Sequence, residues 1–143
     1  MIEILSILTG RRINNPSSVI EQGFVGNSQF TAGCFIKSPK VYSICKGTVL
    51  AVEQDPINST WTITVEVNSQ KWVRYCCISS TNITAGSTLN QNDYIGDSYR
   101  GLMRLEYCTA DKSQFPVRVL SKQLYKQDPT PIIFGQVNLE ASF

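Results

Sequence analysis

The chain contains no histidine, and this absence limits the chemistry that the sequence can support. Histidine is the commonest general base in enzymes and the commonest metal ligand in proteins. Hydrolases that pair a serine or cysteine nucleophile with a histidine base are therefore excluded. Paired carboxylates could still hydrolyse glycosides. Six acidic residues could meet in space for this purpose, but no pair stands out: Glu53, Glu66, Asp93, Asp97, Glu106 and Asp111.

Five cysteines are further candidates for chemistry: Cys34, Cys45, Cys76, Cys77 and Cys108. They form no C-x-x-C pair, so the sequence indicates neither a zinc knuckle nor a redox motif. Several lie among apolar neighbours, and we interpret the set as small buried hydrophobic residues. Cysteines used in this way indicate synthesis in a reducing compartment.

The stretch Gly101–Cys108 brings charged and apolar side chains together, and its pattern predicts one buried β-strand. Successive side chains of a strand point to opposite faces. One face is apolar and should belong to the core: Met103, Leu105 and Tyr107. The other face carries Arg104 and Glu106 beside Leu102. An ordinary solvent face would be less mixed, and a catalytic face would carry histidines or several carboxylates.

Length and composition predict one globular domain. The chain has 143 residues, of which 42% are hydrophobic and 17% are charged. Thirteen basic and eleven acidic residues give a net charge of +2 without a basic stripe, which argues against a nucleic-acid surface. No apolar run is long enough to span a membrane. The apolar start, Met1–Leu8, contains an acid and has no cleavage site, so we expect no signal peptide.

Several short runs rich in β-branched and aromatic residues predict a mainly β fold, an antiparallel sheet with β-hairpins. Three runs are expected to be neighbouring strands: 34–36, 41–45 and 48–53. Trp61–Val67 alternates apolar and polar residues, and a turn joins it to Lys71–Ile78. This pattern predicts a hairpin.

After the predicted hairpin, the sequence indicates a loop over 79–82 and a tight β-arch, not a helix, over 83–96. The stretch 116–120 predicts one more strand, or else the start of a short helix that continues through residue 125. Between these two segments lies the strand 101–108. The whole pattern therefore consists of short strands separated by turns.

The domain organisation has three expected parts. Residues 1–29 form an arm or lead-in with no predicted helix, residues 30–128 form the β domain, and residues 129–143 form a tail after a proline-rich hinge. Within the tail, residues 132–143 alternate apolar and polar residues. They predict either a final strand of the same sheet or a strand added to the sheet of a neighbouring subunit.

An ordered set of glycines and strands runs through the middle of the chain. It comprises Thr31–Phe35, Gly47–Val49, Tyr75–Cys77, an arch with Ile83, Gly86, Leu89, Ile95 and Gly96, and finally Gly101–Tyr107. This set resembles the peptidase M23 (LytM, lysostaphin-like) domain, whose motifs are H-x-G-x-D, G-x-V, Y-x-H, V-x-x-G-x-x-V-x-x-G-x-x-I-G and G-x-H-L-H-F-E-V. The resemblance covers residues 30–108 and implies the β-rich fold of these zinc endopeptidases, which cut peptidoglycan cross-bridges.

The metal-binding and catalytic residues of these family motifs are replaced in this sequence. In the family, zinc is held at the positions of Thr31, Phe35 and Arg104, and two further histidines assist at the positions of Cys77 and Leu102. Zinc needs three N, S or O ligands and an open position. Phenylalanine and leucine supply no ligand, threonine is a poor one, and arginine does not deprotonate. The resemblance therefore implies an inactive domain without a cofactor. It also implies that the Arg104 guanidinium fills the vacated cation position, paired with Glu106 or with another acid.

We therefore expect a non-catalytic structural or interaction protein on an M23-like fold. A short domain without a signal peptide and with apolar arms fits a tailed-phage virion component of the tail tip, hub or baseplate, made in the host cytoplasm. Its partners would be other virion proteins, bound through the terminal arms. This last step is an analogy from fold.

Two alternatives come from other classes of protein. The first is a peptidoglycan- or glycan-binding module that uses the old substrate groove, with Arg104, Glu106, Tyr94 and Tyr99 as candidate contacts. Trp61 and Trp72 are candidates for the same role, but core packing is the preferred interpretation of both. The second is a metal-free hydrolase.

Overall fold

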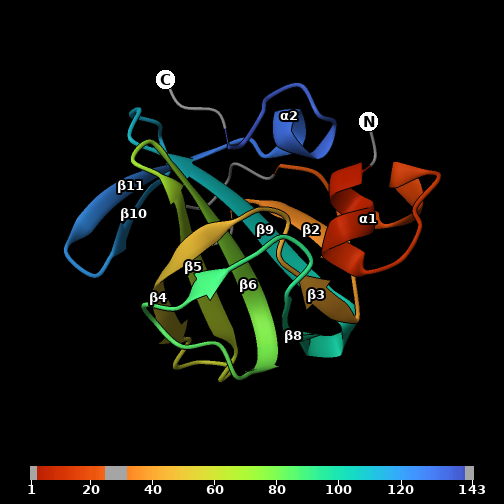
Figure 1. The fold of residues 1–143 in the computed structure, drawn as a ribbon, viewed down its shortest axis with the longest axis horizontal. Coiled ribbons are helices and arrows are strands. Elements are labelled where there is room, and N and C mark those ends of the chain that lie inside the picture. Colours follow the sequence, from red (N-terminus) through yellow and green to blue (C-terminus); the bar gives the residue numbers. More distant parts are fainter. Residues whose placement is uncertain (1–2, 25–31, 141–143) are drawn as a thin grey trace.

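The computed structural model describes residues 3–24 and 32–140, which form an open, mainly antiparallel β-sheet with two short helices packed on it (Figure 1). The helices are α1 (Glu3–Thr9) and α2 (Thr130–Ile133). The strands are β1 (Ile20–Gln22), β2 (Cys34–Lys37), β3 (Lys40–Tyr42), β4 (Gly47–Gln54), β5 (Trp61–Asn68), β6 (Lys71–Thr81), β7 (Thr88–Leu89), β8 (Tyr94–Ser98), β9 (Leu102–Thr109), β10 (Pro116–Val119) and β11 (Lys122–Gln127). Of the helices that the structure describes, none has the length and hydropathy of a membrane span.

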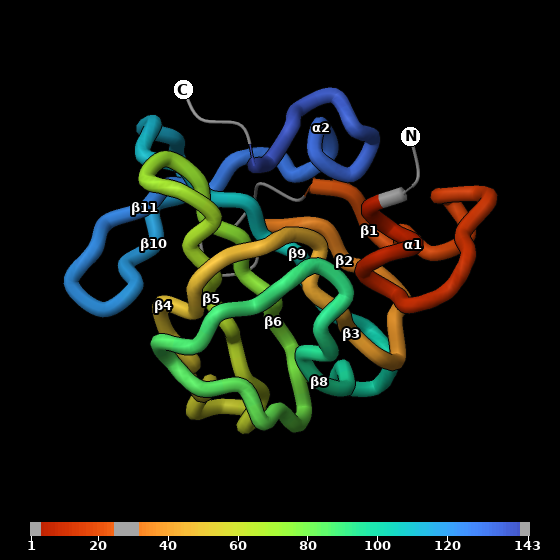
Figure 2. Tube along the Cα trace, in the orientation of Figure 1, coloured from red at the N-terminus to blue at the C-terminus, as the bar shows by residue number. Residues whose placement is uncertain are grey.

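Strand β9 occupies the middle of the sheet. The main strand order is β1-β2-β9-β6-β5-β4-β7, so β9 lies between β2 and β6. The β10–β11 hairpin joins the sheet where β11 pairs with the last residues of β9, and β3 joins through β8, which pairs with the end of β6. The chain trace shows these two attachments at different sides of the sheet (Figure 2). The predicted buried strand 101–108 is thus confirmed, and it pairs with three other strands, β2, β6 and β11.

The predicted hairpin over residues 61–78 is also confirmed. Strands β5 and β6 pair antiparallel, with Ile63 opposite Tyr75 and Val65 opposite Val73. These four side chains are buried in the main core. The turn is set by Asn68, whose side-chain oxygen accepts a hydrogen bond of 2.8 Å from the backbone N–H of Gln70. Burial of alternate residues on one face explains why this part of the sequence was easy to interpret.

The predicted arch over 83–96 contains no helix, as expected, and ends in β8. Strand β8 lies so close to β6 that a Cβ at Gly96 would be 2.2 Å from the carbonyl oxygen of Ser80. Only glycine fits this approach. The expected loop over 79–82 is wrong over residues 79–81, which continue β6 because Ser80 and Thr81 pair with β8.

Residues 3–24 pack onto the domain and include a helix that the sequence did not predict. Helix α1 buries Leu5 and Leu8 completely in the main core, and Ile13 and Val19 follow them there. Strand β1 then pairs with β2. With seven residues, α1 is too short for its apolar spacing to show a helical period, and isolated helices of this length are unstable without packing. Tertiary burial therefore decides its structure.

The C-terminal segment also packs on its own domain. Residues 130–133 form α2, and Ile132, Ile133 and Leu139 are buried in the main core. The buried ammonium of Lys71 donates a 2.9 Å hydrogen bond to the backbone carbonyl of Asn138, which ties the segment to β6. The described part, through residue 140, contains no strand, so the predicted final strand of the same sheet is wrong there, while addition to the sheet of a neighbouring subunit stays a prediction. Residues 141–143 lie outside the described part.

Two further predictions concern the pairing of the strands within residues 34–53 and the structure of residues 116–125. The runs 34–36, 41–45 and 48–53 correspond to β2, β3 and β4, but these strands do not pair with one another. Strand β2 pairs with β9 and β3 pairs with β8, which are distant in sequence and not revealed by local patterns, whereas β4 pairs with β5, the next strand of the chain. Residues 116–119 form a strand, and the helix alternative through residue 125 is wrong because β10 and β11 form a hairpin.

Candidate functional site

Three of the five replaced positions come together around Arg104. Phe35 on β2 is the direct cross-strand partner of Arg104 on β9, and the guanidinium carbon lies 5.8 Å from the centre of the phenylalanine ring. On the other side, Nη1 of Arg104 donates a 3.7 Å hydrogen bond to Sγ of Cys77 on β6. Leu102 begins β9 opposite Lys37 and is half-buried. Thr31 lies outside the described residues.

Cys77 occupies an irregular position in β6. Its φ angle is +65°, in the left-handed region that non-glycine residues rarely adopt, between Cys76, which pairs with β9, and Ile78, which pairs with β5 and β8. The side chain is half-buried. Burial raises the pKa of the Cys77 thiol, and the positive charge of Arg104 lowers it by a smaller amount. The thiol is therefore protonated at neutral pH and poorly suited to nucleophilic attack.

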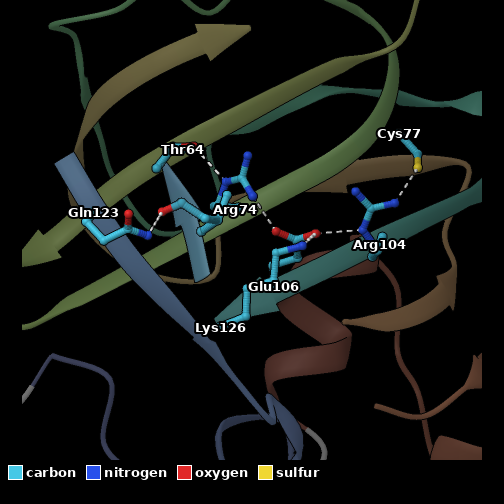
Figure 3. Close-up of polar contacts among 8 residues, drawn as sticks. Thr64, Arg74, Cys77, Arg104, Glu106, Gln123 and Lys126 are labelled. Carbon is cyan, nitrogen blue, oxygen red and sulfur yellow. Dashed lines mark hydrogen bonds and ion pairs between the residues drawn. The ribbon is translucent and has the colours of Figure 1, made fainter. Parts of the chain in front are cut away.

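Glu106 is the centre of a buried ion-pair network (Figure 3). Its Oε1 lies 2.6 Å from Nη1 of Arg74, and its Oε2 lies 2.7 Å from Nε of Arg104 and 3.0 Å from Nζ of Lys126. The Glu106 side chain is 0% exposed, and those of Arg74, Arg104 and Lys126 are 11%, 15% and 2% exposed. Arg74 also donates from Nε to Oγ1 of Thr64 at 3.1 Å.

Strand register explains how the network forms. Arg74 on β6 is the cross-strand partner of both Thr64 on β5 and Glu106 on β9. Arg104 and Glu106 are two residues apart on β9 and therefore share a face. Lys126 reaches the same carboxylate from β11. Four strands thus contribute side chains to one polar layer beneath the sheet surface. The expected pairing of Arg104 with Glu106 is confirmed.

The network is charged at neutral pH. Burial alone would raise the pKa of Glu106, but the positive charges of Arg74, Arg104 and Lys126 hold that pKa below its usual value. Burial would lower the pKa of Arg74, yet Glu106 and nearby acidic groups raise it above normal. Three cations thus surround one carboxylate.

A groove of about 510 Å³ opens above this network. Arg74, Arg104 and Lys126 lie at its floor. Its other lining residues come from β4 and the turn after it, from β5, and from β10: Glu53, Gln54, Asp55, Pro56, Ile57, Thr62, Pro116, Val117 and Arg118. This is the size of a pocket that holds a small ligand or a peptide side chain.

The donor set at the replaced positions does not fit zinc. Phe35 and Leu102 offer no ligand atom, and the Arg104 guanidinium is a fixed cation paired with Glu106. The Cys77 thiol alone cannot form a site. Within residues 3–24 and 32–140, no group of three histidine, cysteine or carboxylate side chains is arranged to hold a metal ion.

The structure separates the other candidate contacts from Arg104. Glu106 is fully buried beneath the groove. Tyr94 and Tyr99 are partly exposed on β8 and the following turn, and neither lines the groove with Arg104. Tyr94 instead packs against Tyr42, with ring centres 5.6 Å apart. The core interpretation of Trp72 is confirmed by its 3% exposure, and Trp61 packs against the main core.

Sequence reasoning missed three cations of the site. Arg74 lies inside a predicted strand between Trp72 and Cys76. A charged residue among such apolar neighbours could have indicated a buried ion pair. Lys126 and Arg118 lie beyond the stretch covered by the family resemblance. Nothing in the local pattern of these two residues indicates that the β10–β11 hairpin folds back against β9.

The fold is that of M23 and LytM-type peptidase domains. No protein-family model matches the chain, and no curated protein matches its sequence. The catalytic domain of lysostaphin from Staphylococcus simulans has a TM-score of 0.58 and 15% identity, covering 80% of this chain and 89% of that domain. A chain from the complex of SpoIIIAH and SpoIIQ has a TM-score of 0.57 and 15% identity, covering 80% and 90%.

A zinc-containing peptidase from Vibrio cholerae has 22% identity and a TM-score of 0.51, covering 62% of this chain. This chain spans only 32% of that peptidase, and 46% of the longer lysostaphin structure. The similarity therefore concerns one domain of larger proteins. At these identities the likeness establishes the fold, including the mainly antiparallel sheet expected from the sequence.

Proposed function

We propose that the protein is a non-catalytic interaction protein built on the M23-like fold. The observation that carries the proposal is the position of Arg104, whose guanidinium lies between Phe35 and Cys77 and is paired with Glu106. By the family resemblance, these are positions where an active enzyme holds its metal and its catalytic histidine. A fixed cation there opposes metal binding, and the chain has no histidine to replace it.

Protein binding is the role that the comparisons favour. One of the similar structures is a complex of two proteins, SpoIIIAH and SpoIIQ, which supports a partner-binding use of this fold. The terminal segments were expected to contact partners, but their described parts are packed in the domain's own core. We therefore place partner contact on the exposed groove and its walls.

The assembly that we propose is a tailed-phage virion, with the protein in the tail tip, hub or baseplate after synthesis in the host cytoplasm. A prophage-encoded M23 protein from Enterococcus faecalis is among the similar structures, with a TM-score of 0.53 and 14% identity. This likeness supports a phage setting for the fold. Mass spectrometry of purified virions, together with the genes that flank this one, tests the assignment. Tail genes on neither side and absence from virions would contradict it.

Cell-wall binding is the second candidate. It is favoured by the groove of about 510 Å³ beside Arg104 and by the likeness to the catalytic domain of lysostaphin. Co-sedimentation with purified peptidoglycan separates the two candidates. Saturable sedimentation that an Arg104→Gln variant loses would support the cell-wall module over the protein-binding role.

The non-catalytic role is tested by a peptidoglycan zymogram and by zinc analysis of the purified protein, with the catalytic domain of lysostaphin as the positive control. We expect no clearing and substoichiometric zinc. Clearing that survives repurification, or one zinc ion per chain, would contradict the proposal.

A further inference from the structure

The floor of the groove has more positive charge than its buried carboxylate can balance. Arg74, Arg104 and Lys126 surround Glu106, the one carboxylate to which all three are paired. The two arginines use Nε and Nη1 for their hydrogen bonds, and among the described residues neither Nη2 has a partner. Arginine carries five N–H donors in a planar fork, so each guanidinium retains donors for an oxyanion.

The unused donors can reach the groove. Arg74 and Arg104 both line it, and their side chains retain 11% and 15% exposure. Partly buried charges interact more strongly than exposed ones, because less water screens them. An anion on this floor would therefore interact strongly with both guanidinium groups.

The apolar residues that line the groove indicate which groups of the ligand lie next to its negative charge. Pro56 and Ile57 line the groove from the turn after β4, and Pro116 and Val117 line it from β10. Ile57 is 93% exposed, which leaves it free to pack against a bound molecule. A ligand that combines a negative charge with nearby apolar groups would match this lining.

The rim limits the number of charges on the ligand. Arg118 adds a cation on the β10 side, while Glu53 and Asp55 add two acids on the β4 side. These acids would repel a polyanion such as a nucleic acid or a polyphosphate. A single carboxylate over the two arginines avoids that repulsion.

We infer that the groove binds an acidic segment of a partner protein, in which one carboxylate contacts Arg74 and Arg104 and apolar side chains lie against the walls. The inference rests on the proposed function, because it names the ligand chemistry of the same non-catalytic groove. Charge complementarity selects the carboxylate, and the apolar residues that two separate segments contribute to the lining favour a peptide segment as its carrier.

The test is a titration of the full chain with a capped peptide, acetyl-Ala-Val-Asp-Val-Ala-amide, followed by NMR signals of backbone and arginine N–H groups. The matched peptide carries Asn in place of Asp. We expect saturable shifts at Arg74 and Arg104 with the Asp peptide and about tenfold weaker binding of the Asn peptide, the loss of one charge-assisted hydrogen bond. Binding should also weaken with added salt.

Two variants and one control locate the site. Arg104→Gln removes a floor cation, and Arg118→Gln removes a rim cation whose exposed position makes misfolding a small risk. Both should weaken binding of the Asp peptide several-fold. Lys112→Gln removes an exposed cation that does not line the groove and should leave the affinity unchanged.

Equal affinity for the two peptides, or binding that neither arginine variant weakens, would overturn the inference. The same titration is repeated with soluble peptidoglycan fragments. Fragments that bind at Arg74 and Arg104 more tightly than the Asp peptide would overturn the choice of a protein partner. Failure of carboxylate binding without hydrolysis would leave the non-catalytic role intact, whereas peptidoglycan hydrolysis would contradict the proposed function itself.

Discussion

Arg74 and Glu106 face each other directly across β6 and β9, with 2.6 Å between Nη1 of the arginine and Oε1 of the glutamate. The pair joins the two strands that contribute most to the site. Two further cations, from Arg104 and Lys126, share the same carboxylate. Structural integrity and surface charge of the groove therefore depend on one buried glutamate.

Replacing Glu106 with glutamine should lower the free energy of unfolding by about 3–5 kcal/mol, because three buried or nearly buried cations lose their counter-charge. Urea denaturation of both proteins at pH 7 measures the difference. Glu21→Gln is the matched control, since its ion pair with Lys37 is more than half exposed on both sides and should contribute less than about 1 kcal/mol. Equal losses in the two variants would contradict the importance of the network.

The same carboxylate should make stability depend on acid pH. The pKa of Glu106 is lowered in the folded state, so its contribution is fully present above the unfolded pKa of about 4.3 and is lost as pH falls towards the folded value. Melting temperatures between pH 3 and pH 7 should fall more steeply for the natural protein than for Glu106→Gln. Parallel profiles would show that Glu106 titrates alike in both states.

Thiol labelling should single out Cys77. Cys34, Cys45, Cys76 and Cys108 are buried, whereas Cys77 is half-exposed. Burial raises the pKa of Cys76 to about 11 and that of Cys34 to about 12, so few of these thiols ionise at pH 8. Mass spectrometry after brief treatment with iodoacetamide should find one slow modification, at Cys77.

A Cys77→Ser variant serves as the control for this labelling. It should remain unmodified over the same period in folded protein. Rapid reaction at any of the four buried cysteines would indicate that the sheet opens more readily than its packing suggests.

Gly96→Ala should destabilise the domain by about 1–3 kcal/mol or more, because the added Cβ would lie 2.2 Å from the backbone oxygen of Ser80 and force β8 away from β6. Gly23→Ala is the control, since none of the described residues lies within 4 Å of its added Cβ. Thermal denaturation of both variants measures the effect. A neutral Gly96→Ala would mean that β8 is not held against β6.

Leu8→Ala should cost about 2–5 kcal/mol, as expected for a fully buried leucine in a core. The measurement is urea denaturation at neutral pH. Because α1 packs with the main core, its loss should weaken the whole domain in one transition. A variant as stable as the natural protein would show instead that residues 3–9 act as a separate arm.

The sequence predicted the parts of the fold that depend on local patterns. Alternation in Trp61–Val67 and the mixed faces of Gly101–Cys108 were interpreted correctly, because burial on one face of a strand leaves a period of two. The pairing of β2 with β9 and of β3 with β8 could not be predicted, since these partners are far apart in the chain. Helix α1 escaped prediction because packing, and not propensity, stabilises it.

The candidate site was predicted in part for a similar reason. Arg104 and Glu106 lie two residues apart on one strand, so the sequence alone suggested their pairing. Lys126 reaches Glu106 only because β11 lies against β9, a contact between residues 20 positions apart. Tyr94 and Tyr99 were candidate groove contacts together with Arg104, but Tyr94 lies on β8 and Tyr99 in the turn after it, and neither lines the groove.

The three cations around Glu106 should also make the melting temperature of the domain sensitive to bound anions. Three cations that share one carboxylate repel one another, so any anion that settles among them relieves repulsion in the folded chain alone. A ligand at a hundredfold excess over its Kd adds about 2.7 kcal/mol to the free energy of unfolding, which is several degrees in Tm. Melting temperature in a panel of candidate molecules can therefore serve as a label-free screen for the natural partner, even while the identity of that partner is still open.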